Sequence, residues 1–481
     1  MDEPRYIIVH GHFYQPPRQS PWTSLIAPEP SAAPFANWNE RILSECYNAN
    51  AHAHTMAGRV AYIRNNYERL NFNFGPTLHS WLETHGKAAN RAIRRANDAS
   101  LKLHNGHGNA IAQAYNHSIL PLLDDRGRDL QIAWGIDDFS FRFGAAPEGI
   151  WLPECAVDDD TLASVARAGI KFVILGADQG HFSSSGREAG PFLWQRDDLS
   201  VAVFRFDRQL AGWIAFSDVM SDGAKFAEAL AGTALSLPPG ATILVATDGE
   251  TFGHHKRTGA AELAHTMSLL EQRDDVIVTN CAAYLADHPA TGRFTINGAS
   301  AWSCAHGIER WRSNCGCRME ANTSQEWRRP MRSAMEFVKD HTEAIYERFA
   351  KPIVEDPWKA LRESAQVFVD SNPATLEAFA KRHKVRDEAA RDRLMRLFEM
   401  VRAGHASLTS CAWFFDDFGG LEGRVALRWA ARALELAAEL TPNVEHELLQ
   451  RLREIQSNRH EVGDAATLYL SVKTREARGR V

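Results

Sequence analysis

Two acidic residues, each placed directly after a run typical of a buried strand, are the most informative feature of this sequence. Glu154 comes just after residues 149–152, and Asp248 comes just after residues 241–246. Cleavage of a glycosidic bond needs at least two carboxyl groups, one as nucleophile or base and one as general acid. Carboxyl groups at the ends of neighbouring strands therefore indicate this chemistry.

Two histidines end a third apolar run at the start of the chain. Residues 6–9 lead into His10 and His12, which the two-residue period of a strand puts on one face. Residues 13–17 then break the strand into a loop. In α/β barrels the loops at the carboxyl ends of the strands build the active site, so we expect these three strand ends to converge.

Four motifs, in order along the chain, resemble those of family 57 of the glycoside hydrolases. They are His10-x-His12 with Gln15-Pro16, the segments 106–109 and 114–122, Trp151-Leu152-Pro153-Glu154, and the run from Asp248 through Glu250 to His254. The resemblance extends over residues 5–312. It implies a distorted (β/α)7 barrel followed by a helical domain, acting on α-linked glucans by a retaining mechanism.

The resemblance also implies roles for individual residues. Glu154 matches the family nucleophile and Asp248 the general acid/base. Glu250 could raise the pKa of Asp248 by charge repulsion, or could instead bind substrate hydroxyls. The residues predicted from the motifs to line the sugar subsites are His10, His12, Gln15, His117, Trp151, Glu250 and His254, together with Trp302, His306 and Trp311 at the position of the fifth family motif.

The acceptor of the second chemical step stays open. Transfer to water would make the enzyme an α-amylase, and transfer to a sugar hydroxyl a 4-α-glucanotransferase or a branching enzyme. This chemistry requires no metal or cofactor. A metal-dependent carbohydrate deacetylase is the alternative for a histidine pair near an acid, but no third ligand is evident and Trp-Leu-Pro-Glu has no place in such a site.

The composition and the spacing of apolar residues change near residue 325. Apolar runs and helical patterns alternate over the first 290 residues, which is typical of a parallel sheet or barrel. The remainder is rich in Ala, Leu, Glu and Arg at helical spacing. We therefore predict a catalytic barrel over residues 1–325 and a helical domain over residues 326–481, packed on the barrel mouth.

An aromatic island at residues 410–420 interrupts the helical half. Trp413 and two phenylalanines come before Asp416 and Asp417. Because a buried, unpaired carboxylate is costly, we expect this segment to lie over the barrel mouth. Trp413 would then stack on a sugar, and Asp416 or Asp417 would accept its hydroxyls. The alternative is that these aromatics only form the interface between barrel and helices.

Composition narrows the range of partners. The chain has 481 residues, 44% of them hydrophobic, and a net charge of −6 with both signs mixed along its length. Neither a nucleic acid nor a membrane surface is expected as a partner. The family resemblance implies an α-glucan or malto-oligosaccharide as the substrate. No run approaches the length of a membrane span, and the acidic first residues do not suggest a secretory signal. Nothing in the sequence sets the oligomeric state.

Seven scattered cysteines favour reduced thiols and a cytoplasmic location. Four potential zinc ligands lie close together in the sequence: Cys304, His306, Cys315 and Cys317. Their spacing is outside the usual structural sets, which place two to four residues between paired ligands. The sequence therefore favours a tight Gly-rich loop with small buried thiols over a zinc site.

Overall fold

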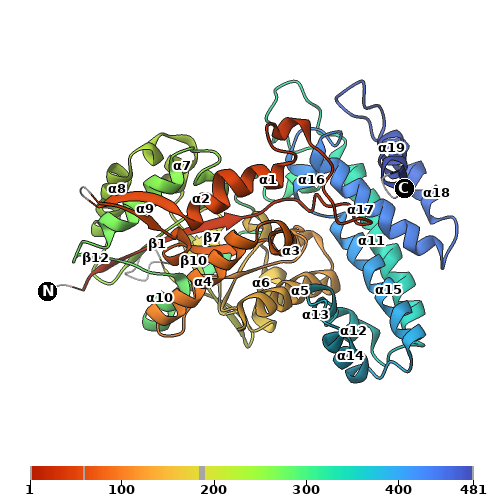
Figure 1. Ribbon diagram of the computed structural model, residues 1–481, viewed down its shortest axis with the longest axis horizontal. Helices are drawn as coiled ribbons and strands as arrows, with labels where there is room; N and C mark the ends of the chain where they lie inside the picture. The colour runs from red at the N-terminus through yellow and green to blue at the C-terminus, as the bar shows by residue number, and fades with distance from the viewer. Residues whose placement is uncertain (1–2, 58–59, 184–189, 479–481) are drawn as a thin grey trace. The chain divides into compact units, whose positions relative to one another are not determined.

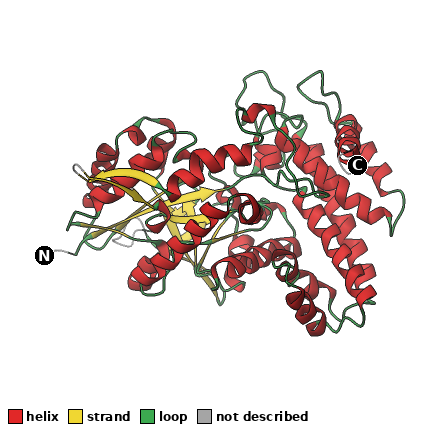
Figure 2. Ribbon diagram, in the orientation of Figure 1, coloured by secondary structure: helices red, strands yellow, loops and turns green. Residues whose placement is uncertain are grey.

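The computed structural model describes residues 3–57, 60–183 and 190–478. The chain forms two compact units, each assembled from separate segments. Unit 1 comprises Met1–Gln15, Pro28–Gln113 and Arg142–Trp302, and unit 2 comprises Pro16–Ala27, Ala114–Phe141 and Ser303–Val481. The strands lie in unit 1, whereas the described part of unit 2 consists of helices, turns and loops (Figure 2).

Seven parallel strands form a closed ring in unit 1. In ring order they are β1 (Arg5–Phe13), β4 (Asn71–Phe74), β5 (Ala112–Gln113), β6 (Gly149–Trp151), β7 (Phe172–Gly176), β10 (Leu199–Phe206) and β11 (Thr242–Asp248). A bridge between Phe72 and Ala110 connects β4 to β5. A hydrogen bond from the Asp207 amide to the Leu244 carbonyl connects β10 to β11. The ring is therefore a (β/α)7 barrel.

Of the remaining strands in the described residues, four extend this barrel and two form a separate pair. β12 (Val276–Val278) pairs with the start of β1, and β9 (Phe192–Arg196) pairs with β10. β13 (Gly292–Ile296) joins β9 to β8 (Gly180–Phe182). β2 (Ala53–Ala57) and β3 (Val60–Arg64) form a separate antiparallel pair.

Helices surround the strands of unit 1 (Figure 1). They are α1 (Trp38–Ile42), α2 (Asn48–Ala51), α3 (Pro76–His85), α4 (Lys87–Leu103), α6 (Asp159–Arg167), α7 (Arg208–Phe216), α8 (Gly223–Leu235), α9 (Gly259–Leu270) and α10 (Cys281–Asp287). Several begin at side chains that cap the first free amides, as Asp158 does for α6 and Asp207 for α7. Asp207 comes directly after β10, so one residue ends the strand and starts the helix.

Unit 2 is helical. Its helices are α5 (Asp125–Phe143, of which the last two residues belong to unit 1), α11 (Arg328–Ala350), α12 (Pro357–Arg362), α13 (Ala365–Val369), α14 (Pro373–Arg382), α15 (Glu388–Ala406), α16 (Cys411–Phe414), α17 (Leu421–Ala438), α18 (Val444–Arg453) and α19 (Ala465–Arg478). The long helices α11, α15 and α17 pack side by side (Figure 1). Buried alanines at 426, 430, 433 and 437 give α17 a narrow face that permits this packing.

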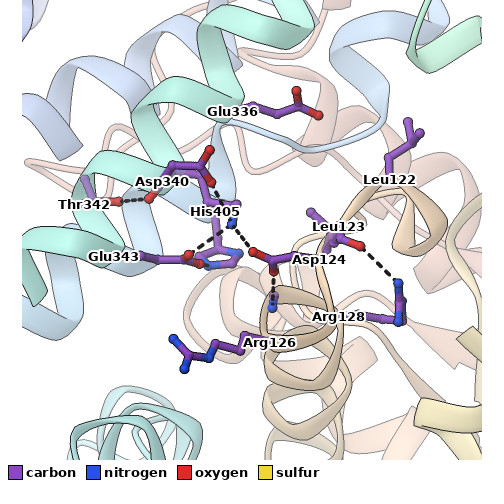
Figure 3. Close-up of polar contacts among 12 residues, drawn as sticks. Leu122, Leu123, Asp124, Arg126, Arg128, Glu336, Asp340, Thr342, Glu343 and His405 are labelled. Atoms are coloured by element: carbon purple, nitrogen blue, oxygen red, sulfur yellow. Dashed lines mark hydrogen bonds and ion pairs between the residues drawn. The ribbon is translucent and has the colours of Figure 1, made fainter. Parts of the chain in front are cut away.

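A charge cluster, buried at Lys339 and Glu343 and exposed at Asp124, joins the segment Ala114–Phe141 to the long helices of unit 2 (Figure 3). The ammonium of Lys339 lies 3.2 Å from Asp124 and 3.0 Å from Glu343. Glu343 also bonds the ring of His405 at 2.7 Å. Because the buried ammonium of Lys339 needs charged partners, Asp124 links the earlier segment to α11, the helix that carries Lys339.

The packing units divide the chain differently from the predicted limits of 1–325 and 326–481. Two early segments pack with the helices, because side chains such as Arg18 and Trp22 bond Glu422 and Glu435 of α17. Such long-range pairs leave no mark in local composition. The placement of the helical domain on a barrel mouth stays a prediction. No helix of the described residues is long and apolar enough to cross a membrane.

Candidate active site

The register of the barrel strands aligns polar side chains at one end of the ring. His12 on β1 lies opposite Asp248 on β11 and opposite Asn73 on β4. On the next two strands of the ring, Gln113 on β5 lies opposite Trp151 on β6. Since paired residues of parallel strands point to the same side, these side chains form one layer at the carboxyl ends of the strands.

Amides from the neighbouring strands hold the two histidines. The Asn71 amide donates to Nδ1 of His10 at 2.7 Å, and Nε2 of His10 lies 3.1 Å from Oδ1 of Asn73. Asn73 in turn donates to Nδ1 of His12 at 3.0 Å. For His10, the Asn71 donor and the Asn73 acceptor assign the ring proton to Nε2. Burial lowers the pKa of both histidines to about 3, so both rings are neutral near pH 7.

Trp151 forms a platform against both rings. Its ring stacks on His10 with centroids 4.7 Å apart and on His12 at 4.9 Å. Trp302 meets Trp151 edge to face at 5.1 Å. Trp151 is fully buried, so its stacking fixes the orientation of both histidine rings. Trp302 is partly exposed.

Glu154 lies in a strained turn directly after β6. Its φ of 59° is in the left-handed region, which non-glycine residues rarely adopt. The indole N–H of Trp302 donates to Oε2 of Glu154 at 3.0 Å, and the backbone amide of Trp302 donates to the Glu154 carbonyl. The turn and these two bonds together fix the direction of the carboxylate.

Asp248, at the end of β11, keeps a solvent-accessible surface, although nearby protein atoms desolvate its carboxyl group. Desolvation, and after it the negative charge of Glu154, raise its pKa from 3.8 to about 7. A carboxyl group that keeps its proton near neutral pH can act as a general acid.

Glu250 is buried two residues beyond Asp248. It accepts hydrogen bonds from the Tyr47 hydroxyl at 2.7 Å and from the Tyr14 amide at 3.2 Å. Desolvation and then the charge of Asp248 raise the pKa of Glu250 to about 8. The charge that raises the pKa of Asp248 is that of Glu154 and not that of Glu250. Asp248 instead raises the pKa of Glu250.

The family model of glycosyl hydrolase family 57 matches residues 26–297, more than half of the chain. The chain belongs to this family. The resemblance read from the motifs is therefore confirmed. A second family model, described as a domain of unknown function (DUF3536), matches residues 324–477.

Relatives of the family 57 chain include Alpha-amylase 1 of Dictyoglomus thermophilum, 26% identical over 31% of this chain and 21% of that protein. The 4-alpha-glucanotransferase of Thermococcus litoralis is 24% identical over 44% of this chain and 30% of that protein. The matched stretches thus span less than a third of either relative.

A solved structure with the same fold is that of an exo-type maltose-forming amylase from Pyrococcus sp. ST04. Its TM-score is 0.70 at 15% identity, over 98% of this chain and 83% of that one. The predicted (β/α)7 barrel followed by a helical region is confirmed.

Other residues predicted to bind sugar in this family 57 chain have structural partners within their own units. In unit 1, His254 pairs with Glu45, and Gln15 is nearly buried at the end of the first segment. In unit 2, Nδ1 of His117 lies 2.6 Å from the Ser410 hydroxyl, and the Trp311 ring is fully buried. Their contact with a sugar stays a prediction.

Most of the aromatic island packs inside unit 2, and Phe415 is its exposed ring. Trp413 is fully buried, and its indole N–H donates to the Arg328 carbonyl at 3.1 Å. Asp416 accepts hydrogen bonds from the backbone amides of Met319 and Glu320. The cost of burying this carboxylate is offset by backbone donors, which the sequence does not reveal.

Asn71, Asn73, Gln113 and Tyr47 contribute to the site but were not predicted from the sequence. Asn71 and Asn73 alternate with Phe72 and Phe74, so the two-residue period puts both amides on one face of β4. This alternation of amides and aromatic rings is the sequence pattern that could have predicted both asparagines as site residues. Gln113 and Tyr47 carry no comparable local pattern.

Proposed function

We propose that this chain is a retaining enzyme acting on α-linked glucans, with Glu154 as nucleophile and Asp248 as general acid/base. The observation that carries the proposal is the electrostatic pair at the ends of β6 and β11. The charge of Glu154 helps raise the pKa of Asp248 to about 7, so Asp248 can donate a proton in one step and accept a proton in the next. A retaining mechanism requires such an acid/base beside a carboxylate nucleophile.

In the first step Glu154 attacks the anomeric carbon and forms a glycosyl–enzyme ester. The bond from that carbon to the leaving oxygen breaks, and Asp248 transfers its proton to that oxygen. In the second step the ionised Asp248 takes a proton from the acceptor, whose oxygen displaces Glu154. Trp302 positions Glu154 through the hydrogen bond to Oε2.

The neutral histidines suit a cationic transition state. Positive charge develops at the anomeric carbon of an oxocarbenium-like transition state, and a charged imidazolium nearby would oppose it. With pKa values of about 3, His10 and His12 stay uncharged over the working range. The ring of His12 can still donate a hydrogen bond to a sugar hydroxyl when it is neutral, whereas both nitrogens of His10 are bonded to asparagine amides.

The acceptor can be water or a sugar, and similarity to both an amylase and a 4-alpha-glucanotransferase supports keeping both. A branching enzyme is a third form of the same chemistry. The deacetylase alternative is less favoured, because both nitrogens of His10 face asparagine amides. Among the described residues, no group of three potential metal ligands includes His10 or His12.

The decisive experiment incubates the enzyme with maltoheptaose and with glycogen and separates the products by chromatography. Shorter sugars alone indicate hydrolysis, longer ones indicate 4-α-transfer, and new α-1,6 linkages indicate branching. Proton NMR during the first turnovers should show α-anomeric products. Initial β-products would overturn the retaining mechanism, and no action on either glucan would overturn the substrate class.

The nucleophile is tested with Glu154→Gln, which keeps the shape and removes the charge. We expect kcat to fall by several orders of magnitude while glucan binding persists. Azide should restore turnover to Glu154→Gly, because a small nucleophile can occupy the vacated space. Near wild-type activity of Glu154→Gln would exclude this assignment.

A further inference from the structure

Four potential metal ligands converge in unit 2, in a segment outside both matched family ranges. Sγ of Cys304, Nδ1 or Nε2 of His306, Sγ of Cys315 and Sγ of Cys317 all lie within 4.8 Å of one another. All three cysteines are free thiols. Residues 298–323 lie between the two family matches, so neither describes this cluster.

The distances within the cluster fit a tetrahedron around one ion. The Cys304 sulfur lies 3.9 Å from that of Cys315 and 3.8 Å from that of Cys317. The Cys317 sulfur lies 3.5 Å from Nδ1 of His306. With Zn–S bonds of about 2.3 Å and Zn–N bonds of about 2.0–2.1 Å, a regular tetrahedron has S···S edges of about 3.8 Å and S···N edges of about 3.5 Å.

The backbone has the form that such ligands require. Gly307 comes directly after His306, and Gly316 separates Cys315 from Cys317. Both glycines have φ near +80°, in the left-handed region. This turn lets two cysteines only two residues apart aim at one point, which explains how a spacing outside the usual sets can form a site.

Backbone donors surround the sulfurs. The Cys304 sulfur accepts hydrogen bonds from the amides of His306 and Arg310, and the Cys317 sulfur accepts one from Ala305. Such N–H···S bonds orient thiolate ligands and share their negative charge. The Cys317 carbonyl is itself held by the Arg328 guanidinium at 2.9 Å.

We infer that Cys304, His306, Cys315 and Cys317 bind one structural zinc ion. Three thiolates and one neutral imidazole fill all four positions, which is the closed set of a structural site and leaves none for a substrate. The cluster suits one ion better than disulfides, because three thiols cannot all pair with one another.

The position of the site suggests what the metal stabilises. Cys304 comes two residues after Trp302, which bonds Glu154. Just beyond Cys317, Asp416 holds the amides of Met319 and Glu320. Zinc would therefore close the loop from Cys304 to Cys317 at the start of this segment of unit 2, just before the amides that Asp416 holds.

The first test is the metal content of the full-length protein, purified without a metal-affinity tag or chelator. Plasma mass spectrometry should find about one zinc per chain. Cobalt(II) in place of zinc should give the intense visible absorption of a tetrahedral thiolate site. Absence of zinc together with no stoichiometric zinc uptake would overturn the inference, and so would iron as the bound metal.

The second test compares variants in competition with a zinc-binding dye. Cys317→Ser and His306→Ala should weaken zinc binding at least about tenfold, as loss of a ligand does. His306 is exposed, so its variant should keep the far-ultraviolet circular dichroism of the native fold. Cys411→Ser, at a cysteine outside the cluster, is the matched control and should bind zinc like the wild type.

The third test does not depend on any variant folding. Native protein is treated with iodoacetamide before and after removal of zinc, and alkylation is located by mass spectrometry. Cys304, Cys315 and Cys317 should become reactive together when zinc is removed and be protected again when it is restored. The site would be contradicted if alkylation of these cysteines were the same with and without zinc. It would also be contradicted if two of the three formed a disulfide in protein purified under reducing conditions.

Discussion

Trp302 binds Glu154 at both ends of the residue, through its indole N–H to the carboxylate and its backbone N–H to the carbonyl, each at 3.0 Å. Glu154 has a left-handed backbone that the chain adopts only under constraint. The second bond stabilises that backbone, and the first turns the carboxylate. A single residue thus sets both the position and the orientation of the proposed nucleophile.

Trp302→Phe keeps an aromatic ring and the backbone bond but removes the indole N–H. A hydrogen bond to a carboxylate contributes about 1.5–3 kcal/mol, so kcat should fall about 10- to 100-fold. KM should change little, because the lost contact orients the nucleophile. Trp194→Phe is the matched control, since Trp194 donates a similar bond of 2.8 Å to Asp159 outside the site. Equal effects of both variants would show a purely structural role.

The raised pKa of Asp248 predicts an alkaline limit of activity. The general acid must be protonated, so kcat/KM should decline as pH rises through about 7. Because the charge of Glu154 contributes to this shift, Glu154→Gln should lower the pKa of Asp248. Carbon-13 NMR of labelled aspartate carboxyls would follow that titration. An unchanged titration in Glu154→Gln would mean that the two groups do not interact.

Glu250 should make the folded state less stable as pH rises. Its pKa is about 8 in the folded protein and near 4.5 when unfolded, so the folded state binds more protons between these values. The folded state therefore loses stability as pH rises between these two pKa values, and Glu250→Gln should remove that loss. We expect the Tm of Glu250→Gln to exceed that of the wild type at pH 9 but not at pH 4. Exposed Glu228→Gln is the control.

The Lys339 cluster should be a main determinant of stability in unit 2. Lys339→Met leaves Glu343 and His405 buried without the ammonium, which should cost about 3–5 kcal/mol of unfolding free energy. Lys351→Met removes an exposed pair with Glu347 on the same helix and should cost less than about 1 kcal/mol. Urea denaturation measures both. A small effect at Lys339 would mean that the cluster does not fix segment Ala114–Phe141.

Local patterns were enough to predict a parallel sheet or barrel with acidic strand ends, whereas the seven-stranded barrel followed from the family resemblance. Apolar runs that end in Glu154 or Asp248 carry their own signal, because strand period and burial depend on neighbouring residues. The histidine pair at the end of β1 was visible in the same way. Strand register then determines which residues face each other, as His12 and Asp248 do.

Contacts between distant parts of the chain could not be predicted. Nothing near Trp22 indicates that it bonds Glu435, so the early segments of unit 2 were assigned to the barrel. His306 was grouped with sugar-binding residues, yet it lies against the Cys317 sulfur. The left-handed turn at Gly316 that brings these cysteines together depends on tertiary structure and not on spacing.

Trp413 distinguishes a core role from a sugar-binding role. The aromatic island was predicted to face a sugar, but the Trp413 ring is fully buried, its N–H is paired with Arg328, and the Arg332 guanidinium lies over its face. Trp413→Ala should therefore lower the unfolding free energy by about 3–5 kcal/mol, the usual cost of truncating a large core side chain. Phe415→Ala, at an exposed ring of the same island, should cost under about 1 kcal/mol.

The discriminating measurement is KM for maltoheptaose at a temperature where both variants are folded, because a core residue changes stability without changing substrate contacts. A large rise in KM for Trp413→Ala with wild-type stability would restore the sugar-stacking role and require the chain to uncover this ring during turnover.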